Sequence, residues 1–294
     1  MGSGSFSSEK ICLTTFLLFE WGSTSDMAYD HARKAGNRGD VWKHFGLVSL
    51  AEEMTLGEVC RYDDLHAGAP IHQLLPGGEW EKGIGEVLRR CSLQHPYFAT
   101  AKAFVQERRY PAGWMLIAGR LATRCRVVEV HLADLAEGVA TRYNEPLPKD
   151  VPANVNVRFE QSDGFTRVAN LDGSDLVFID PPFHPKADAD WRALTAACKQ
   201  LSHRRICFVA WYPIYSPTRP QKLVDTTGCS AWEVIWARCG PKPSQNLKGC
   251  GMLASTELAP IFKRIEVSLS AVASCMGGEL KVRSPRPPNL LCPA

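Results

Sequence analysis

Features that would place this chain in several common protein classes are missing from its sequence. Its most apolar stretch, Ile11 to Trp21, is too short to cross a bilayer, and no signal-peptidase-like site follows it. The eleven cysteines include no C-x-x-C pair, which argues against a disulfide framework and against a structural zinc site. No internal repeat is visible. We therefore expect a globular protein of the reduced cytoplasm that needs no metal.

Neither sign of charge dominates the chain, whose net charge is +3, but the charges are unevenly distributed. Residues 82–126 hold nine lysines and arginines against two acids, whereas residues 127–190 hold twelve acids against five bases. A basic segment beside an acidic half is typical of a protein that grips a polyanion near a site for a cation. A solvated helical face would explain the basic segment equally well.

The hydrophobic pattern predicts an α/β fold. Helical spacing of apolar residues over 39–54 predicts a first helix, and a short strand follows it before Asp63. Beyond residue 112, helical segments alternate with β-type runs, which cover residues 126–133, 154–160, 176–179, 206–212 and 232–238. This alternation predicts a doubly wound, mostly parallel sheet.

Composition divides the rest of the chain around this sheet. We expect one domain over residues 27–276, in which the basic, Gly/Pro-interrupted residues 71–112 form a small inserted helical subdomain. Residues 1–26 are predicted to be an extension outside the fold, and the Pro-rich residues 277–294 a disordered tail.

Three of the predicted strand ends carry groups suited to a nucleotide-like ligand, which doubly wound sheets bind at the carboxyl ends of their strands. The turn "DLHAGA" after the first strand contains Gly68, where a ligand can approach the backbone closely. Glu129 can accept hydrogen bonds from ribose hydroxyls, and Asp163 in "SDGF" from an adenine amine. Gly68 and Glu129 lie much farther apart than the roughly 20 residues of a dinucleotide fingerprint, so a different adenosine-containing cofactor is favoured over NAD.

The fourth strand ends in "DPPF", in which Asp180 follows the apolar run and two prolines terminate the strand. An acid–Pro–Pro–aromatic sequence at this place looks like the catalytic motif of S-adenosylmethionine-dependent amino-methyltransferases. The exocyclic amine of adenine is a poor nucleophile, because its lone pair is delocalised into the ring. Asp180 and the carbonyl of Pro181 can both accept hydrogen bonds from that amine, while Phe183 offers a face on which a flipped base stacks.

The resemblance extends beyond this motif. Over most of residues 29–276 the chain resembles the RlmJ family of bacterial large-subunit ribosomal RNA adenine-N6 methyltransferases, through the segments "YDHARKAGNRGDVWKH", "DLHAGA", "EVH", "SDGF", "DPPF" and "AWYP". The resemblance implies a Rossmann-like methyltransferase sheet of seven strands with a small helical insertion. It also implies S-adenosylmethionine as cofactor, 23S ribosomal RNA, naked or partly assembled, as substrate, and a monomeric enzyme.

The family pattern assigns roles to individual residues of this chain. The residues that it implies to contact S-adenosylmethionine, or to lie beside it, are His44, His66, Glu129, Asp163, Gly164 and Asp180, to which the turn adds Gly68. By the same likeness Asp180 accepts the proton, and the residues that face the RNA are Tyr29, His31 and Lys43.

Some positions depart from the family pattern. Arg61 and Asp63 interrupt a strand that the family makes apolar, which predicts a short or shifted first strand, and Pro70 replaces a loop glycine. Two alternatives therefore stay open beside the RNA enzyme, namely a DNA adenine-N6 methyltransferase and a nucleic-acid-binding protein whose cofactor loop has decayed. Without the family pattern, His44 and His66 would be interpreted as structural histidines.

Overall fold

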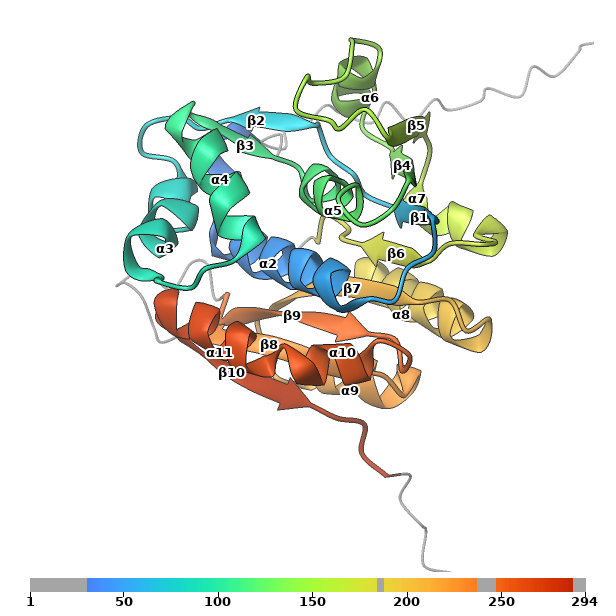
Figure 1. Ribbon diagram of the computed structural model, residues 1–294. Helices are drawn as coiled ribbons and strands as arrows, with labels where there is room; N and C mark the ends of the chain where they lie inside the picture. The colour runs from blue at the N-terminus through green and yellow to red at the C-terminus, as the bar shows by residue number, and fades with distance from the viewer. Residues whose placement is uncertain (1–30, 184–187, 237–246, 288–294) are drawn as a thin grey trace, which may run out of the picture. The chain divides into compact units, whose positions relative to one another are not determined.

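Eight strands form one mixed sheet in the computed structural model, which describes residues 31–183, 188–236 and 247–287 (Figure 1). The order across the sheet is β10-β8-β9-β7-β6-β1-β4-β5. The strands from β5 to β7 run parallel, whereas β9 is antiparallel to both β7 and β8, and β10 is antiparallel to β8. Their bounds are β1 Val59–Asp64, β4 Val127–Asp134, β5 Val155–Gln161, β6 Leu176–Ile179, β7 Phe208–Ile214, β8 Ser230–Trp236, β9 Gly249–Ala254 and β10 Gly278–Arg283.

The strand order reverses at β1, and this reversal fixes the place of the ligand site. From β1 the chain adds β4 and then β5 on one side, and it crosses over to place β6 on the other side of β1. In doubly wound sheets the crevice at such a reversal, outside the carboxyl ends of the strands, is where ligands bind. A ligand site is therefore expected at the carboxyl ends of β1 and β6.

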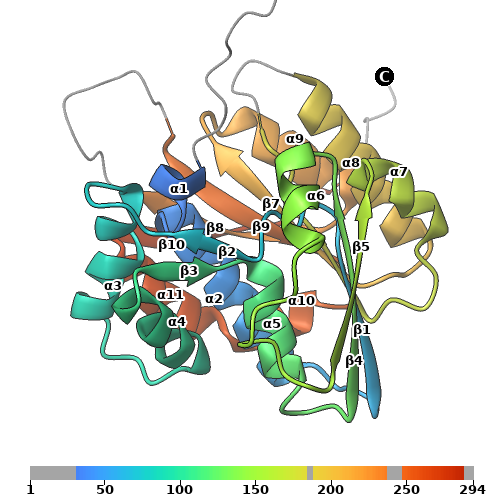
Figure 2. The ribbon, with the colours of Figure 1, turned by 90° about the horizontal axis from the view of Figure 1, so that it is seen from above.

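Helices cover both faces of the sheet (Figure 2). Because side chains alternate along a strand, β6 sends Leu176 and Phe178 into one apolar cluster, and Val177 and Ile179 into the other. The helices of the first cluster are α2 (Arg38–Glu53), α3 (Ile84–Arg90), α4 (Pro96–Gln106), α5 (Gly113–Leu121), α10 (Ala259–Arg264) and α11 (Glu266–Cys275). Those of the second are α8 (Asp188–His203) and α9 (Thr218–Thr227), with the short α7 (Gly164–Arg167) beside them. The short helices α1 (His31–Lys34) and α6 (Glu137–Tyr143) and the 3-10 helices η1 (Glu79–Glu81) and η2 (Val168–Asn170) complete the set in the described ranges.

The segment predicted to be a helical insertion contains α3, α4 and a small β-ribbon. Its first residues form β2 (Ile71–Gln73), which pairs antiparallel with β3 (Arg109–Pro111) near its end. The ribbon brings the two ends of the segment together. Apolar side chains of α3 and α4 belong to the same core cluster as α2, so the segment packs on the main fold.

Two predictions about strands are wrong. Residues 278–283 of the predicted disordered tail form β10, an eighth strand, which pairs antiparallel with β8, and its Arg283 makes a buried ion pair with Glu233 of β8 at 2.7 Å. The first strand is neither short nor shifted, since all six residues of β1 pair with β4. Residues 1–26 and 288–294 lie outside the described residues.

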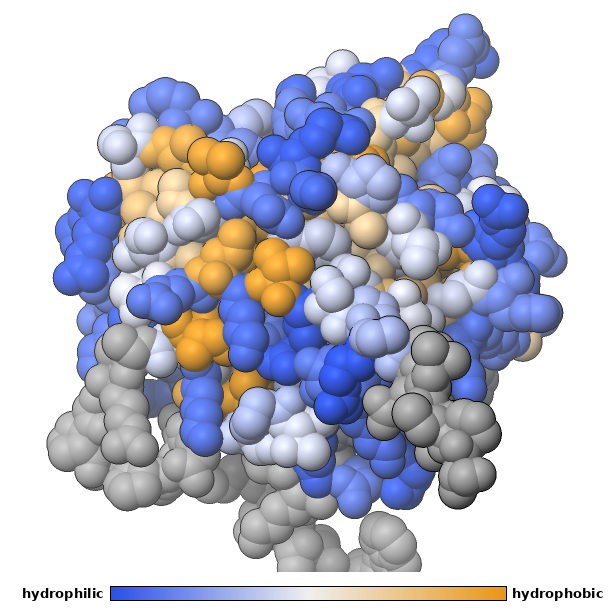
Figure 3. Space-filling view, turned by 90° about the horizontal axis from the view of Figure 1, so that it is seen from below, coloured by the Kyte–Doolittle hydropathy of each residue, from blue (hydrophilic) through white to orange (hydrophobic). Residues whose placement is uncertain are grey.

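The surface carries little that is unusual for a globular protein. No helix in the described ranges is long and apolar enough to cross a bilayer. Figure 3 views the face that includes α11 and β10, and apolar side chains gather on its left half among hydrophilic ones. The most exposed large apolar side chain of the described residues, Val267 of α11, has 82% of its surface accessible.

Candidate active site

Four acidic side chains lie at the carboxyl edge of the parallel strands. Asp64 is the last residue of β1, Asp134 is the last of β4, Asp163 follows β5, and Asp180 follows β6 directly. Because parallel neighbours end at the same edge of a sheet, these carboxyl groups surround the point where the strand order reverses. This edge is the candidate active site.

Asp180 is ion-paired with Lys43, which comes from α2. The Lys43 Nζ lies 2.6 Å from Asp180 Oδ2 and 2.7 Å from Asp40 Oδ1. The N-cap residue Asn37 accepts a hydrogen bond from the Asp40 backbone N–H, which fixes the start of α2 and so the direction of this lysine. The structure thus places Lys43, which the family pattern assigned to RNA, against the acid of "DPPF".

The pKa values of Asp180 and Lys43 are both raised by their surroundings. Burial raises the pKa of the Asp180 carboxyl, and the neighbouring Lys43 opposes that rise. Burial lowers the pKa of Lys43, but the carboxylates of Asp180 and Asp40 outweigh it and raise that pKa above its usual value. Lys43 is therefore a permanent cation that favours the ionised form of Asp180.

Asp64 is a buried acid that sequence reasoning missed. Its carboxylate accepts hydrogen bonds from the Tyr62 hydroxyl and from the His66 backbone N–H, each at 3.1 Å. Burial, and then the charge of Asp180, raise its pKa to about 7, although these hydrogen bonds and Lys43 act in the opposite direction. Near neutral pH Asp64 is on the border of ionisation, so a cation placed beside it would favour the charged carboxylate. Its position as the last acid before "LHAGA" was the available signal.

The turn after β1 is held open by contacts from α6 and from the end of β4. Gly68 has a φ of +64° and no described atom within 4 Å of where a Cβ would stand. Its N–H donates to Asp134 Oδ2 at 3.0 Å, and its carbonyl accepts from the Tyr143 hydroxyl at 2.9 Å. A ligand can therefore approach this backbone without meeting a side chain of the turn.

His66, in the same turn, has a ring nitrogen that lacks a partner. Its Nδ1 is buried and makes no hydrogen bond to any described residue, while the ring stands edge-on to Phe165, 4.9 Å away between centroids. Burial lowers the pKa of His66 to about 4, so the ring is neutral at physiological pH. A neutral imidazole with a buried free nitrogen needs a polar partner, which a bound ligand would supply.

The prediction that Glu129 ends its strand is wrong. Glu129 is the third residue of β4, where it lies opposite Arg61 of β1, and the strand continues to Asp134. The strand ends only one residue beyond the predicted range 126–133, and Glu129 lies near its start. Asp134, and not Glu129, is therefore the acid at the end of the second parallel strand.

Replacing Asp134 should weaken cofactor binding, whereas replacing Glu129 should not. In Asp134→Ala the Gly68 N–H loses its acceptor and any ribose loses a carboxylate, for which we expect about 1–3 kcal/mol in binding free energy. Glu129→Ala is the matched control from the same strand. Isothermal titration with S-adenosylmethionine compares the two variants, and equal losses would refute the assignment of Asp134.

Asp163 and Gly164 begin the short helix α7 after β5. Asp163 is the N-cap residue, and its side chain accepts from the Phe165 N–H at 2.9 Å. Gly164 packs against the backbone of Leu65, since a Cβ at this position would stand 1.9 Å from the Leu65 carbonyl oxygen. Only glycine lets α7 begin so close to the turn after β1.

His44 lies deeper in the protein than the other predicted cofactor contacts. Its Nδ1 is 3.1 Å from the Tyr110 hydroxyl, which in turn is 2.8 Å from the Tyr97 hydroxyl. Its Nε2 faces Gly113 at the start of α5, and burial lowers the pKa of the ring to about 3. This chain of buried hydrogen bonds accounts for His44 as a structural residue, and its contact with the cofactor stays a prediction.

The other two residues assigned to RNA lie at the N-terminal boundary of the described chain. Tyr29 lies outside the described residues, and His31 is the first residue of α1. Their contact with RNA stays a prediction.

An aromatic wall stands beside Asp180. Phe183 has ring-centroid distances of 5.2 Å to Trp191 of α8 and 6.1 Å to Trp211 of β7. Lys43 Nζ lies 5.6 Å from the centroid of the Trp211 ring, so this wall adjoins the ion pair. Trp211 belongs to the "AWYP" segment, and its position explains why that segment accompanies "DPPF" in the family pattern.

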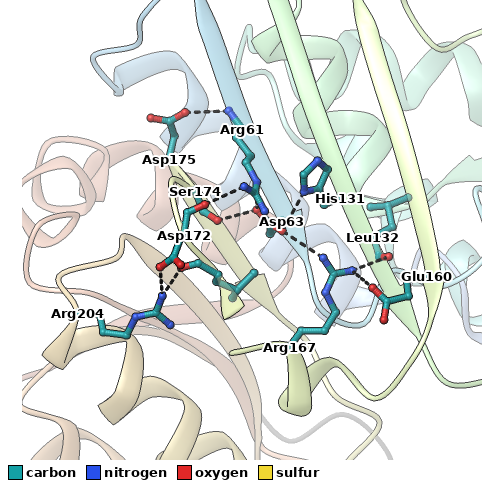
Figure 4. Close-up of polar contacts among 11 residues, drawn as sticks. Arg61, Asp63, His131, Leu132, Glu160, Arg167, Asp172, Ser174, Asp175 and Arg204 are labelled. Atoms are coloured by element: carbon teal, nitrogen blue, oxygen red, sulfur yellow. Dashed lines mark hydrogen bonds and ion pairs between the residues drawn. The ribbon is translucent and has the colours of Figure 1, made fainter. Parts of the chain in front are cut away.

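A buried polar network ties β1 to α7 on the other side of the strand from Asp64 (Figure 4). The carboxylate of Asp63 lies 2.7 Å from Ser174 Oγ, 3.1 Å from Arg61 Nε and 3.7 Å from Arg167 NH2. Arg167, the last residue of α7, also donates to the Leu132 carbonyl of β4 at 3.2 Å. Arg61 and Asp63 thus compensate each other, which explains why they do not shorten β1.

The basic residues 82–126 divide into two groups in the structure. Arg109 pairs with Glu107 and Asp150, Arg120 pairs with Glu52, and Arg124 donates to the carbonyls of Ala51 and Met54. These arginines hold the fold together and are poor candidates for phosphate contacts. Apart from Arg124, the exposed cations of the segment are Lys82, Arg89, Arg90, Lys102, Arg108 and Arg126, and Arg126 pairs with the equally exposed Glu58.

A doubly wound sheet with a strand reversal at β1, an open turn and an acidic carboxyl edge defines a Rossmann-like methyltransferase fold. Comparisons with known proteins agree with this assignment. The chain is 29% identical over 244 residues to ribosomal RNA large subunit methyltransferase J of Haemophilus influenzae. The aligned region covers 76% of this chain and 83% of that protein. It is 27% identical over 260 residues to the protein of the same name from Escherichia coli, which covers 81% of this chain and 88% of that one.

The fold of this chain is also seen in a solved structure. Protein LPL1258 from Legionella pneumophila superposes with a TM-score of 0.68 at 20% identity, over 85% of this chain and 98% of that chain. No protein-family model matches the sequence. The predicted resemblance to the RlmJ family is confirmed: over most of its length the chain is similar to two proteins named ribosomal RNA large subunit methyltransferase J, which supports S-adenosylmethionine as its cofactor.

The residues at the carboxyl edge fit that cofactor. The Asp134 carboxylate at the end of β4 accepts from the Gly68 and Ala136 N–H groups, the buried Nδ1 of His66 has no hydrogen-bond partner among the described residues, and Gly68 leaves the backbone accessible. The acids Asp64 and Asp180 provide negative charge for a sulfonium cation, and burial has raised the pKa of both. When bound, the cofactor supplies an electrophilic methyl group to this edge.

Proposed function

We propose that this chain methylates the N6 amine of an adenine in 23S ribosomal RNA. The observation that carries the proposal is the position of Asp180, Pro181 and Phe183, at the carboxyl end of β6 and next to the strand reversal. The names of the two relatives support an RNA substrate of the large ribosomal subunit. We further propose that the enzyme acts as a monomer in the cytoplasm, on naked or partly assembled RNA.

The acid and the carbonyl of the motif activate the amine. Asp180 and the Pro181 carbonyl each accept a hydrogen bond from the adenine N6 group, which draws the nitrogen toward tetrahedral geometry as the new bond forms. The proton that the amine loses passes to Asp180. Lys43, 2.6 Å from Asp180, keeps this carboxylate ionised after the substrate has excluded water.

The aromatic side chains hold the base. A target adenine must leave its stack to reach Asp180, and the energy of unstacking is partly regained on the ring of Phe183. Trp191 and Trp211 support that ring on two sides. The acceptor amine is thereby held in line with the methyl group, which is the main requirement for this transfer.

The turn after β1 does not support the alternative hypothesis of a nucleic-acid-binding protein with a decayed cofactor loop. Gly68 keeps its positive φ, β1 is complete, and Asp134 takes the position that the sequence had given to Glu129. Pro70, which replaces a loop glycine, is followed directly by β2, and its carbonyl accepts from the Ala112 N–H at 2.8 Å. A proline is therefore accommodated at the entrance to the insertion.

The proposal is tested by offering the purified protein three substrates with labelled S-adenosylmethionine: protein-free 23S ribosomal RNA, 16S ribosomal RNA and duplex DNA. We expect N6-methyladenosine in the 23S digest by mass spectrometry of nucleosides, at one position. If label appears in DNA alone, the protein is a DNA adenine-N6 methyltransferase and the proposed RNA substrate is wrong. Label in no nucleic acid, with cofactor binding intact, would refute the proposed function.

A further inference from the structure

A hollow adjoins the aromatic wall of the candidate active site. It has a volume of about 320 Å³ and is lined by Trp191, Tyr215, Ser216 and Arg219. These residues come from the first turn of α8, the segment after β7 and the first turn of α9. The volume lies at the lower end of the range for small-molecule sites, which suits a single nucleotide better than a larger ligand.

Trp191 connects this hollow to the motif that carries the chemistry. Its ring lies 5.2 Å from Phe183 and 5.8 Å from Tyr212 between centroids, and it is also one wall of the hollow. One indole therefore separates the place for the flipped adenine from the hollow. Adjacent nucleotides of one strand can occupy the two places at once.

The lining of the hollow has the chemistry of a nucleotide site. Tyr215 provides an aromatic face for a base, the largely buried Trp191 contributes the part of its ring that lines the hollow, and Ser216 provides a hydroxyl. Burial raises the pKa of Tyr215, so its phenol remains a hydrogen-bond donor at physiological pH. None of the four lining residues is acidic, in contrast to the carboxyl edge beside it.

Arg219 supplies the charge that a phosphate requires. Its guanidinium pairs with Asp188 at 2.5 Å, but both side chains are exposed, at 39% and 65% of their surface. An ion pair so open to water contributes little, so an RNA phosphate can replace Asp188 as partner at small cost. A planar guanidinium also binds phosphate through two parallel hydrogen bonds.

We propose that this hollow binds the nucleotide next to the target adenine, with its base against Trp191 and Tyr215 and its phosphate on Arg219. The inference rests on the proposed function, because it takes a nucleic acid strand as substrate. It adds a base-binding subsite outside the "DPPF" motif. The enzyme then recognises its target together with one neighbour.

The test combines variants of the hollow with RNA that lacks one base. The variants are Tyr215→Ala and Arg219→Ala, with Tyr215→Phe to keep the ring and Lys199→Ala, on an exposed position of α8, as the control for lost charge. The substrates are a short RNA hairpin with one target adenine and two versions in which the 5′ or the 3′ neighbour is an abasic ribose. Steady-state methylation gives KM and kcat for each combination.

In the parent enzyme one of the two abasic substrates should raise KM about tenfold, in the range of a lost base–aromatic stack. Tyr215→Ala should raise KM for the intact hairpin by a similar factor and should no longer distinguish the abasic substrate. Arg219→Ala should raise KM for all three hairpins, while Tyr215→Phe and Lys199→Ala should behave like the parent. Cofactor affinity and kcat should stay unchanged in all four variants.

Two other results would separate a failure of the subsite from a failure of the proposed function. If Tyr215→Ala keeps the parental KM or the parental sensitivity to the abasic site, the subsite is refuted although the methyltransferase function stands. If the parent methylates no RNA, the proposed function fails, and fluorescence anisotropy with the same hairpins then decides the subsite by itself. Equal affinities of the parent and Tyr215→Ala for the intact hairpin would refute it in that case.

Discussion

Asp180→Asn should reduce methyl transfer by about two to four orders of magnitude, in the range of lost proton-transfer assistance. Asparagine keeps one acceptor oxygen but cannot take up the positive charge that develops on the amine. Its N–H also faces the N–H of the substrate. The measurement is single-turnover methylation of an adenine-containing ribosomal RNA hairpin at saturating cofactor.

Asp40→Asn is the matched control for this variant. Asp40 also contacts Lys43, at 2.7 Å, so its replacement removes one carboxylate from the lysine and leaves Asp180 in place. We expect a much smaller loss of rate in this control. In Asp180→Asn, Asp40 in turn remains as a partner of the buried lysine, so urea unfolding should show only a modest loss of stability. If Asp180→Asn methylates at the parental rate, "DPPF" is only a strand terminator.

The dependence of the rate on pH gives an independent check of the same carboxyl group. Burial raises the pKa of Asp180, and the protonated form cannot accept the proton of the amine. The rate of the parent should therefore fall as the pH decreases through a value above the usual carboxylic acid range. Asp180→Asn should lack this decrease.

Gly164→Ala should weaken S-adenosylmethionine binding by about one to two orders of magnitude. The new Cβ would stand 1.9 Å from the Leu65 carbonyl oxygen and 2.7 Å from its carbonyl carbon, so α7 must move away from the turn after β1. Such forced shifts cost about 1–3 kcal/mol in well-packed proteins. The movement displaces Asp163, the N-cap residue of the same helix.

Gly138→Ala provides the comparison for that variant. Gly138 lies in α6, which follows β4 as α7 follows β5, and no described atom lies within 4 Å of its added Cβ. Alanine should leave binding unchanged there and should stabilise the helix slightly. Isothermal titration with S-adenosylmethionine measures both variants, and thermal unfolding shows whether each remains folded. Parental affinity in Gly164→Ala would contradict the close packing between α7 and the turn.

The sequence by itself determined the class of fold and the placing of its main motif. Periods of two and of about 3.6 in the apolar residues belong to the local chain, so the alternation of strands and helices could be predicted from them. The two prolines after Asp180 fixed the end of β6 for the same local reason. The place of Asp163 and Gly164 after a strand was also predicted correctly, because a strand end followed by Asp-Gly is visible within a few residues.

Only the tertiary structure decided which charges meet. Lys43 and Asp180 are 137 positions apart, and no local pattern indicates that they form an ion pair. The pairing of β4 with β5 continues to Asp134, so this acid, and not Glu129, ends the strand. Likewise β10 pairs with β8, and Arg283 of the supposed tail forms a buried ion pair with Glu233 there. Electrostatic pairing and strand register act through space, so the sequence supplies the charged groups and the fold selects their partners.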